Sequence, residues 1–433
     1  MSECHHVGEV DGIVLLIINT GSSNDRSWTS RQQGTRNQPS PQHYPPPITS
    51  LKGMKPLSTL LVCTSLILSS LGNSSACTAL MMKDANGNAY QARTMEWAGM
   101  LPESIHYFPS GSSIQSQTPD AKQGMTFKTK YGFIGVSLKH MTPNAKQPCI
   151  AEGANDQGMS LSLNAFLGAE APSVDTDPSK VLSVMDFGAW ALGNFQNVAQ
   201  VKQALQNKEI SVWLPPIAFL GGMKAPVHYA LFDKTGAGIV VEFAEGKLNI
   251  YDNPVGVMTN IPEFPWHLKN LNNYAQLTNV DRNSGTFGSL KVSAPDSGNA
   301  LAGIPFTQIS PGRFVKAAFF TTYVQKAKTP AEAIQTLSHV INNFDRPYEL
   351  SIDPPSGGEG AEGGDAHAVS SEVTLFTTMN DLAQNQFYIR PINSINFSKI
   401  DLRKLADLKE VKKISIDTIA QLDGRDATQL FLK

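Results

Sequence analysis

The segment from Met54 to Cys77 constrains this chain more than any other, because it has the three parts of a secretory signal. Met54-Lys55-Pro56 gives a positive start, residues 57–71 form a mostly apolar run, and small residues at 72–76 precede Cys77. The apolar run is shorter than the roughly 20 residues that a membrane-spanning helix needs, so we expect no stable membrane anchor. A buried helix is the alternative, but small polar residues follow the run in place of an amphipathic continuation.

The signal sets the expected boundaries of the chain. Such signals stand at a true amino terminus, so we expect translation to start at Met54 and cleavage to fall before Cys77. The mature protein would then be exported, to the periplasm or beyond. Residues 20–50 are crowded with Ser, Gln, Asn, Pro and Gly and offer too little apolar surface to offset ordering. We predict that residues 1–53 are disordered or untranslated, 54–76 are the signal peptide and 77–433 form one domain.

Composition narrows the possible functions. Lys and Arg number 35 against 37 Asp and Glu, a formal net charge of −2, so no basic surface for a nucleic acid is expected. With 41% hydrophobic and 17% charged residues, the chain can bury a core. Wholesale disorder and a fibrous fold are excluded.

The cysteines do not form a disulfide framework. Cys4 and Cys63 lie before the expected cleavage point, which leaves Cys77 and Cys149 in the mature chain. Cys77 has three possible roles. It could be a nucleophile whose own amino group is freed by cleavage, a lipid-modified anchor, or one half of a disulfide with Cys149.

Strand and helix signals follow Cys77 in blocks. Segments 78–82 and 89–95 flank Asn86-Gly87, a dipeptide that favours the tight turn of a β-hairpin. Helical spacing of apolar residues predicts a helix pair or an interrupted helix over 181–205. Further strands are expected at 227–260, 372–378 and 386–389, and further helices at 313–324 and 329–343. This order predicts two antiparallel sheets with helices outside them.

Several reaction classes lack their usual motifs. The sequence has no Gly-x-Ser-x-Gly, Ser-x-x-Lys, His-Glu-x-x-His or Cys-x-x-Cys, and the histidines of the expected mature chain are scattered without ligand spacing. We therefore predict no metal and no cofactor. The glycine run at 357–364 lacks the Lys and Ser/Thr of a phosphate-binding loop, so a flexible surface loop is expected there.

An amino-terminal Cys77 is chemically suited to nucleophilic catalysis. A free α-amino group has a pKa of about 7.7 to 8.0 and a thiol about 8.5, so the two groups of one residue are nearly matched for proton transfer. A terminal Thr activated by its own amine is a known variant, and cysteine is the better nucleophile. Cys77 could therefore act as nucleophile and base together.

Four motifs in order resemble those of the choloylglycine hydrolase and penicillin V acylase family. They are Cys77-Thr78, Arg93-Thr94-Met95-Glu96-Trp97, Met258-Thr259-Asn260 and Ser310-Pro311-Gly312-Arg313-Phe314-Val315. Asn155-Asp156-Gln157-Gly158-Met159 and Ile400-Asp401-Leu402 extend the resemblance over most of residues 77–433, with features closer to the Gram-negative members. The resemblance implies an N-terminal nucleophile hydrolase with an α+β fold, a four-layer αββα sandwich, and hydrolysis of a non-peptide amide bond.

The resemblance also implies catalytic roles. Cys77 would attack the amide carbonyl, with its α-amine taking the thiol proton and a thioester forming on the sulfur. Asn260 and Asn164 would stabilise the oxyanion, at roughly 2.7 to 4 kcal/mol per donor in other hydrolases. A turn at a strand end is the alternative for Asn260, and the alignment at Asn164 tolerates a one-residue slip. Arg93 and Arg313 would supply positive charge near the thiol, or else form structural ion pairs.

Glu96 departs from the family pattern, which usually has Asp there. It would accept a hydrogen bond from the Cys77 amine or hold Arg93, and a plain salt bridge with Arg93 is the alternative. The extra methylene could displace the amine unless the backbone adjusts.

Substrate choice is left open by the sequence. The Gram-negative group is associated with penicillin V and N-acyl-homoserine lactones, so a small-molecule acyl amide with an aliphatic or aromatic acyl group is favoured over conjugated bile salts. Met and aromatic residues could line the acyl pocket or belong to the core: Met81, Met82, Met95, Trp97, Met100, Phe133 and Phe166. The alternatives are a bile salt hydrolase, an acyl transferase and a lipoprotein acylated at Cys77. By resemblance, a homotetramer is expected.

Overall fold

The computed structural model describes residues 76–98, 103–138, 145–170, 172–352 and 371–433. The predicted extension, nearly all of the predicted signal and the glycine run lie outside these residues. The chain divides into two units, residues 1–64 and 65–433, and every described residue belongs to the second. Within the described part, no helix is long and apolar enough to cross a membrane.

The predicted amino-terminal hairpin is confirmed. β1 (Cys77–Lys83) pairs antiparallel with β2 (Ala89–Ala98), and Cys77 stands opposite Met95. In the connecting loop, Gly87 takes a φ of 87°, a conformation that glycine adopts without steric cost. The Asp84 carboxylate accepts the backbone N–H groups of Asn86 and Asn88 at 2.8 and 2.9 Å, which closes the loop. Cys77 is thereby fixed at the first position of a central strand.

Two antiparallel sheets form the centre of the fold. The first has six strands in the order β16-β1-β2-β19-β20-β21, and the second has eight in the order β15-β14-β13-β8-β7-β6-β3-β22. The added strands of the first sheet are β16 (Val257–Met258), β19 (Glu372–Asp381), β20 (Gln386–Pro391) and β21 (Ser398–Asp401). Those of the second are β3 (Glu103–Phe108), β6 (Phe133–Leu138), β7 (Cys149–Asn155), β8 (Met159–Ala165), β13 (Val227–Asp233), β14 (Gly238–Ala244), β15 (Lys247–Asp252) and β22 (Lys412–Ser415). The strands predicted over 227–260 and the closing hairpin β19–β20 are confirmed.

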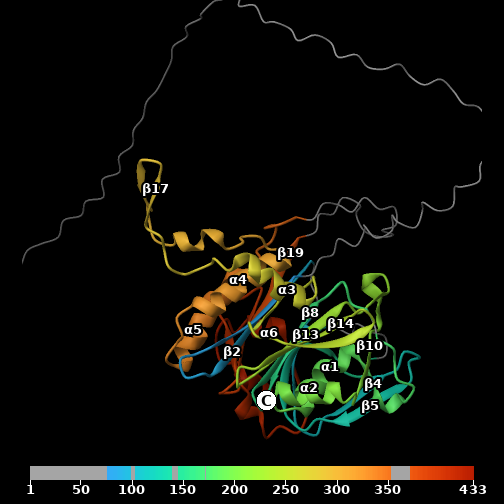
Figure 1. Cartoon of the computed structure of the whole chain (residues 1–433). Coiled ribbons are helices and arrows are strands. Elements are labelled where there is room, and N and C mark those ends of the chain that lie inside the picture. The colour runs from blue at the N-terminus through green and yellow to red at the C-terminus, as the bar shows by residue number, and fades with distance from the viewer. Residues whose placement is uncertain (1–75, 99–102, 139–144, 171, 353–370) are drawn as a thin grey trace, which may run out of the picture. The chain divides into compact units, whose positions relative to one another are not determined.

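Short strand pairs stand beside these sheets. They are β4 (Ser113–Gln117) with β5 (Gln123–Lys128), β9 (Val181–Ser183) with β10 (Ser211–Trp213), β11 (Pro216–Ile217) with β12 (Met223–Lys224), and β17 (Ser284–Phe287) with β18 (Leu290–Ser293). The β17–β18 hairpin extends away from the two sheets (Figure 1).

Helices cover the outer face of each sheet. α4 (Ser310–Tyr323) and α5 (Pro330–Ile341) pack on the six-stranded sheet, and α1 (Phe187–Asn194) and α2 (Val198–Gln206) pack on the eight-stranded one (Figure 1). α3 (Phe264–Asn270), α6 (Ile416–Ala420) and α7 (Thr428–Leu432) are shorter. The α+β class and the αββα order of layers are therefore as predicted.

The helix boundaries differ from the predicted ones at two places. Residues 181–183 form strand β9, so the predicted helical zone begins only at Phe187. α4 starts at Ser310, which puts Arg313 inside its first turn. α5 follows the prediction, because the Thr329 hydroxyl and the Glu332 carboxylate form a capping box at its start.

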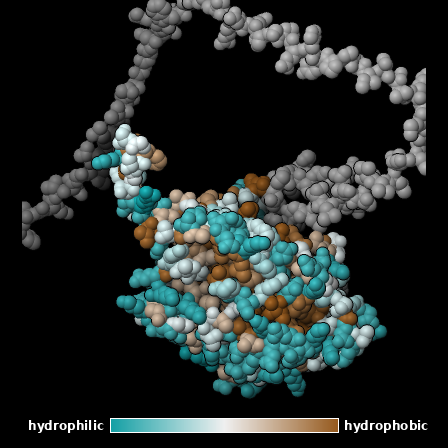
Figure 2. Space-filling view, viewed as in Figure 1, coloured by the Kyte–Doolittle hydropathy of each residue, from teal (hydrophilic) through white to brown (hydrophobic). Residues whose placement is uncertain are grey.

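Two hydrophobic clusters account for the layers. One lies between the sheets and beneath α1 and α2. The other joins the six-stranded sheet to helices α4 and α5 and also includes Ala230, Phe232 and Val240 of the eight-stranded sheet. The face shown in Figure 2 is mostly hydrophilic, with apolar side chains visible in limited areas. Burial of apolar surface in both clusters supplies the main driving force for this arrangement.

Close approach of the neighbouring strands β6 and β7 depends on glycine in β7. A Cβ at Gly153 would lie 2.3 Å from the Ile134 carbonyl oxygen and 3.0 Å from the Gly135 Cα.

Gly153→Ala should therefore lower the free energy of unfolding by about 2 kcal/mol or more, measured by urea denaturation. Gly285→Ala is the matched control, because its Cβ would meet only Val292 at 3.7 Å. Equal stability of the two variants would contradict this account of the packing.

Candidate active site

Cys77 opens β1 with its side chain on the face between the two sheets. The thiol is 3% exposed and free. Cys149 is also a free buried thiol, so the structure does not form the disulfide that was one alternative for Cys77. Burial raises the pKa of the Cys77 thiol, and the charges of Arg93 and Arg313 partly oppose that rise. These two cations are thus the groups that favour a thiolate at this place.

Arg93 contacts the Cys77 sulfur directly. It stands opposite Ala79 in the β1–β2 ladder, so strand alternation puts its side chain on the same face as the thiol. Its Nη2 lies 3.3 Å from the Cys77 Sγ and donates to the Leu163 carbonyl at 2.6 Å. The guanidinium is fully buried, and its Nε lies 4.0 Å from the Glu152 carboxylate. Arg93 therefore links Cys77 of β1 to the eight-stranded sheet.

Sequence reasoning missed Glu152. It lies on β7, 59 positions from Arg93 in the chain, and accepts the Ser162 hydroxyl proton at 2.6 Å. Burial raises the pKa of its carboxyl to about 7, against the lowering effect of Arg93. A charged residue within an otherwise apolar and small-residue strand was the available signal, since a buried acid needs a partner.

Arg313 approaches Cys77 from the opposite face of β1. Its guanidinium donates to the Cys77 carbonyl, to the Thr78 hydroxyl at 2.8 Å and to the Asn260 Oδ1 at 2.7 Å. Its Nε donates to the Gln308 carbonyl at 2.8 Å. Burial lowers the pKa of Arg313 to about 10, so the group stays a cation at neutral pH. Arg313 therefore holds the start of β1, Asn260 and the entry to α4 together.

Asn260 joins Arg313 to the Cys77 nitrogen. Its Oδ1 accepts the Cys77 N–H at 3.0 Å, and its Nδ2 donates to the Ala165 carbonyl at 2.8 Å. The two donors at Oδ1 fix the orientation of the amide. The structure thus brings Asn260 to Cys77 with its oxygen toward the Cys77 nitrogen, while its amide N–H is directed to the Ala165 carbonyl, and the oxyanion role of Asn260 stays a prediction.

Asn164 lies at the site but points its amide elsewhere. Its Nδ2 donates to the carbonyls of Thr259 and Met258 at 2.7 and 3.4 Å. These contacts hold the segment that leads into Asn260. An oxyanion role for Asn164 stays a prediction, and in this geometry the amide protons are directed to backbone oxygens.

Glu96 forms neither of its predicted contacts among the described residues. Positions 93 and 96 of one strand project to opposite faces, so Glu96 lies on the Arg313 side of β2, away from Arg93. The Cys77 nitrogen is bonded to Asn260, and the Glu96 carboxylate accepts the Thr374 hydroxyl at 3.0 Å. Burial raises the pKa of Glu96 to about 7, and the Arg313 charge opposes this.

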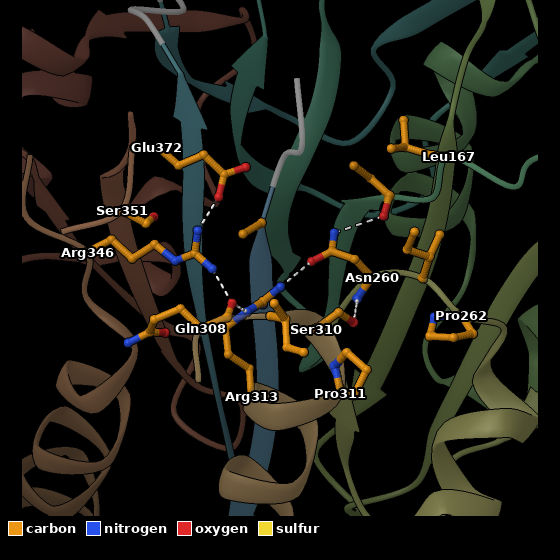
Figure 3. A pocket seen from close by; sticks show the side chains of 14 residues that line it. Leu167, Asn260, Pro262, Gln308, Ser310, Pro311, Arg313, Arg346, Ser351 and Glu372 are labelled. Atoms are coloured by element: carbon orange, nitrogen blue, oxygen red, sulfur yellow. Dashed lines mark hydrogen bonds and ion pairs between the residues drawn. The ribbon is translucent and has the colours of Figure 1, made fainter. Parts of the chain in front are cut away.

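A pocket of about 560 Å³ lies beside this cluster (Figure 3). Arg346, Ser351 and Glu372 lie on one side of Arg313, and Leu167 and Pro262 lie on the other. The full lining is Ala76, Ala165, Leu167, Asn260, Ile261, Pro262, Gln308, Ile309, Ser310, Pro311, Arg313, Arg346, Ser351 and Glu372. Arg346 forms an ion pair with Glu372. The pocket therefore has a polar end and an apolar end.

The residues suggested for an acyl pocket lie mainly in the core. Met81 and Met82 pack in the cluster under α4 and α5, and Met95 and Phe133 belong to the inter-sheet cluster. Phe166 is buried and stacks on His228, Trp97 packs against the inter-sheet cluster, and Met100 lies outside the described residues. The apolar pocket wall comes from loop residues, whose lack of periodicity gave no sequence signal.

The described part of the chain offers no clustered metal ligands. There, no group of three or more His, Cys, Asp and Glu side chains is arranged to hold a metal ion.

Comparison with known families identifies the chain. The family model "linear amide C–N hydrolases, choloylglycine hydrolase family" matches residues 77–415. The chain belongs to this family. The match begins at Cys77, the residue that the site geometry surrounds.

Two curated relatives and one solved structure illustrate the similarity. The chain is 30% identical over 268 residues to a bile salt hydrolase/transferase of Clostridium perfringens, covering 62% of this chain and 78% of the relative. It is 24% identical over 375 residues to a penicillin V acylase of Pectobacterium atrosepticum, covering 82% and 89%. The crystal structure of a variant of the C. perfringens conjugated bile acid hydrolase superposes with a TM-score of 0.64 at 25% identity, covering 78% and 97%.

Glu152 should make stability depend on pH. Its folded pKa of about 7 lies above the ordinary 4.5, so the stability it contributes is present below pH 4.5 and is lost as pH rises toward 7. Glu152→Gln cannot ionise. The unfolding free energy of the variant minus that of the parent should therefore rise between pH 4.5 and 7, by up to about 3 kcal/mol.

Urea denaturation at pH 5 and pH 8 measures this difference, with Glu410→Gln as a surface control. If the unfolding free energy of Glu152→Gln minus that of the parent does not rise between these two pH values, the Glu152 carboxyl is not the group that titrates.

Proposed function

We propose that this choloylglycine hydrolase family member hydrolyses an acyl amide through Cys77 as an amino-terminal nucleophile. The observation that carries the proposal is the placement of Cys77 between two buried arginines, with its nitrogen bonded to Asn260. Arg93 contacts the Cys77 sulfur, and Arg313 contacts the Asn260 oxygen that accepts the Cys77 N–H. A thiol held in this way can be deprotonated by its own amine.

The proposed reaction has two halves. The Cys77 thiol gives its proton to its α-amine, and the sulfur attacks the amide carbonyl. The resulting tetrahedral intermediate expels the amine, which takes the proton from the α-ammonium, and a thioester is left on Cys77. A water molecule, deprotonated by the same amine, then attacks the thioester. The carboxylic acid leaves and the thiol recovers its proton.

Fixed charges support both steps. Arg93 at 3.3 Å from Sγ stabilises the thiolate that attacks and the thiolate that leaves. Arg313 keeps Asn260 in place, and Asn260 accepts a hydrogen bond from the Cys77 nitrogen. Because Arg93 and Arg313 are buried, their electrostatic effect is screened little by solvent.

Cleavage before Cys77 is part of the proposal. An amide nitrogen is not basic, so the Cys77 nitrogen can act only after Ala76 is removed. Ala76 also lines the pocket, and its carbonyl accepts the Glu96 N–H at 2.9 Å. Removing the residues up to Ala76 would therefore free the amine and enlarge the pocket next to the sulfur. Export with signal cleavage at this bond would supply that step.

We propose a substrate of the penicillin V or N-acyl-homoserine lactone type. Leu167, Ile261 and Ile309 line the pocket although their side chains are 40%, 42% and 64% exposed, and such side chains suit an apolar acyl group. The polar end with Arg346 and Glu372 would face the amine portion. The similarity to a penicillin V acylase over 82% of the chain supports this choice.

A conjugated bile salt is the second candidate. The relative at 30% identity is named a bile salt hydrolase/transferase, and the superposition with the C. perfringens conjugated bile acid hydrolase variant covers 97% of that chain. Initial rates of amine release from penicillin V, an N-acyl-homoserine lactone and a glycine-conjugated bile salt distinguish the candidates. Faster turnover of the bile salt would overturn the preferred substrate while leaving the reaction class intact.

Cys77→Ser tests the nucleophile. Amine release should fall by a factor on the order of a hundred or more, because a hydroxyl is a far weaker nucleophile than a thiolate near neutral pH. Cys149→Ala is the control, since that buried thiol contacts neither arginine among the described residues. Circular dichroism should show both variants folded. Activity of Cys77→Ser equal to that of the control would remove Cys77 from the mechanism.

The uncleaved chain should be inactive. Protein from a non-exporting host that retains Ala76 should release no amine, whereas intact-mass analysis of active protein from an exporting host should find Cys77 first with a free amine. A lipid-modified Cys77 would favour the lipoprotein alternative. Robust turnover by a chain that keeps Ala76 would contradict the proposed base.

A further inference from the structure

The backbone of Asn260 is held by side chains and not by a strand partner. β16 ends at Met258, two residues earlier. The Asn260 N–H donates to the Ser310 Oγ at 2.9 Å, and its carbonyl lies 2.9 Å from the His267 Nε2. Since a carbonyl only accepts, the His267 Nε2 must carry the proton. The orientation of Asn260 thus depends on two contacts from α3 and α4.

His267 is built into the fold as a rigid donor. Its side chain is 2% exposed, and its ring stacks on Phe314 of α4, with centroids 4.6 Å apart and planes 14° apart. Burial lowers the pKa of His267 to about 4, so the imidazole is neutral at physiological pH. A neutral ring with its proton on Nε2 donates to the Asn260 carbonyl without adding another positive charge beside Arg313.

The start of α3 is fixed by a second buried group. The Phe264 N–H, unpaired within the helix, donates to the Glu242 carboxylate at 3.2 Å. Glu242 also bonds the His228 Nδ1 at 3.1 Å, and the His228 Nε2 lies 3.3 Å from the Thr259 carbonyl. The helix that carries His267 and the segment that carries Asn260 are therefore tied to one carboxylate on β14.

We propose that His267 is a positioning residue for the amide hydrolysis, which holds the Asn260 carbonyl so that the Asn260 side chain faces the Cys77 nitrogen and Arg313. This inference rests on the proposed roles of Cys77 and Asn260. His267 does not line the pocket, so it acts through Asn260 and not on the substrate. Without the Nε2 donor, the carbonyl of Asn260 would lose its buried partner and the residue could rotate.

Two substitutions separate the hydrogen bond from the ring stacking. His267→Gln keeps an N–H donor near the Nε2 position and loses the ring, whereas His267→Phe keeps the ring on Phe314 and loses the donor. A lost hydrogen bond at a buried carbonyl costs roughly 1 to 3 kcal/mol, which corresponds to about 5- to 150-fold. We expect the kcat of His267→Phe to fall at least tenfold, with KM changed less than threefold, and His267→Gln to keep at least a third of the parent kcat.

Alkylation of Cys77 by iodoacetamide provides a readout that needs no substrate. On the mature protein at pH 7, the labelling rate at Cys77, followed by peptide mass analysis, should fall in His267→Phe and be restored in His267→Gln. This comparison holds even where none of the tested amides is hydrolysed, so failure of the proposed function and failure of the inference are distinguishable.

The reverse order would overturn the inference. If His267→Phe keeps more activity and more labelling than His267→Gln, or if both match the parent, His267 serves only as packing against Phe314. His267→Met, which lacks both donor and ring, provides a third variant where one of the first two does not fold. It must follow His267→Phe in both measurements, and parent-like rates would also refute the positioning role.

Discussion

The buried guanidinium of Arg313 is the interaction on which the geometry of the site depends. It donates to four groups from three separate segments: the Cys77 carbonyl, the Thr78 hydroxyl, the Asn260 Oδ1 and the Gln308 carbonyl. A buried cation is costly unless its donors are satisfied, so these segments can separate only by exposing an unpaired charge. The first turn of α4, which carries Arg313, therefore fixes the start of β1 and the position of Asn260. The rigid Arg fork suits this task better than a lysine, whose charge is a single point.

Strand alternation then divides the charges of the site between two faces. Arg93 and the Cys77 thiol lie between the sheets with Glu152, whereas Arg313 lies on the helical side with Glu96. Burial raises the pKa of one acid on each face to about 7, Glu152 beside Arg93 and Glu96 on the side of Arg313, where Arg346 and Glu372 form a further ion pair. The Cys77 thiol is thus close to positive charge, which opposes the rise in its pKa that burial causes. In the proposed mechanism, the same charge would stabilise the thiolate.

The sequence was sufficient for the features that depend on local chemistry. Asn86-Gly87 indicated the first hairpin, Thr329-Pro330 the start of α5, and motif resemblance the set of Cys77, Arg93, Asn260 and Arg313 that the structure gathers. Contacts set by sheet register were not accessible in this way. Glu152 contacts Arg93 only because the second sheet places β7 beneath β2. His267 is an isolated histidine in the sequence, and only the packing of α3 brings it to the Asn260 carbonyl. The predicted contact between Glu96 and Arg93 was wrong, because positions 93 and 96 of one strand project to opposite faces.

The β-bulge in β19 determines which side chain stands opposite Glu96, at the position where the resemblance predicted an aspartate. Phe376 stands opposite Met95, and an unbroken ladder would put Leu375 opposite Glu96. The register shift between Thr374 and Phe376 puts Thr374 there instead, and leaves Leu375 in the inter-sheet core. A hydroxyl then meets the longer carboxylate at 3.0 Å, and the Arg346 N–H donates to that same hydroxyl at 2.8 Å. The bulge thus gives the Glu96 carboxylate a hydroxyl partner on β19, while the Cys77 nitrogen has Asn260 as its partner.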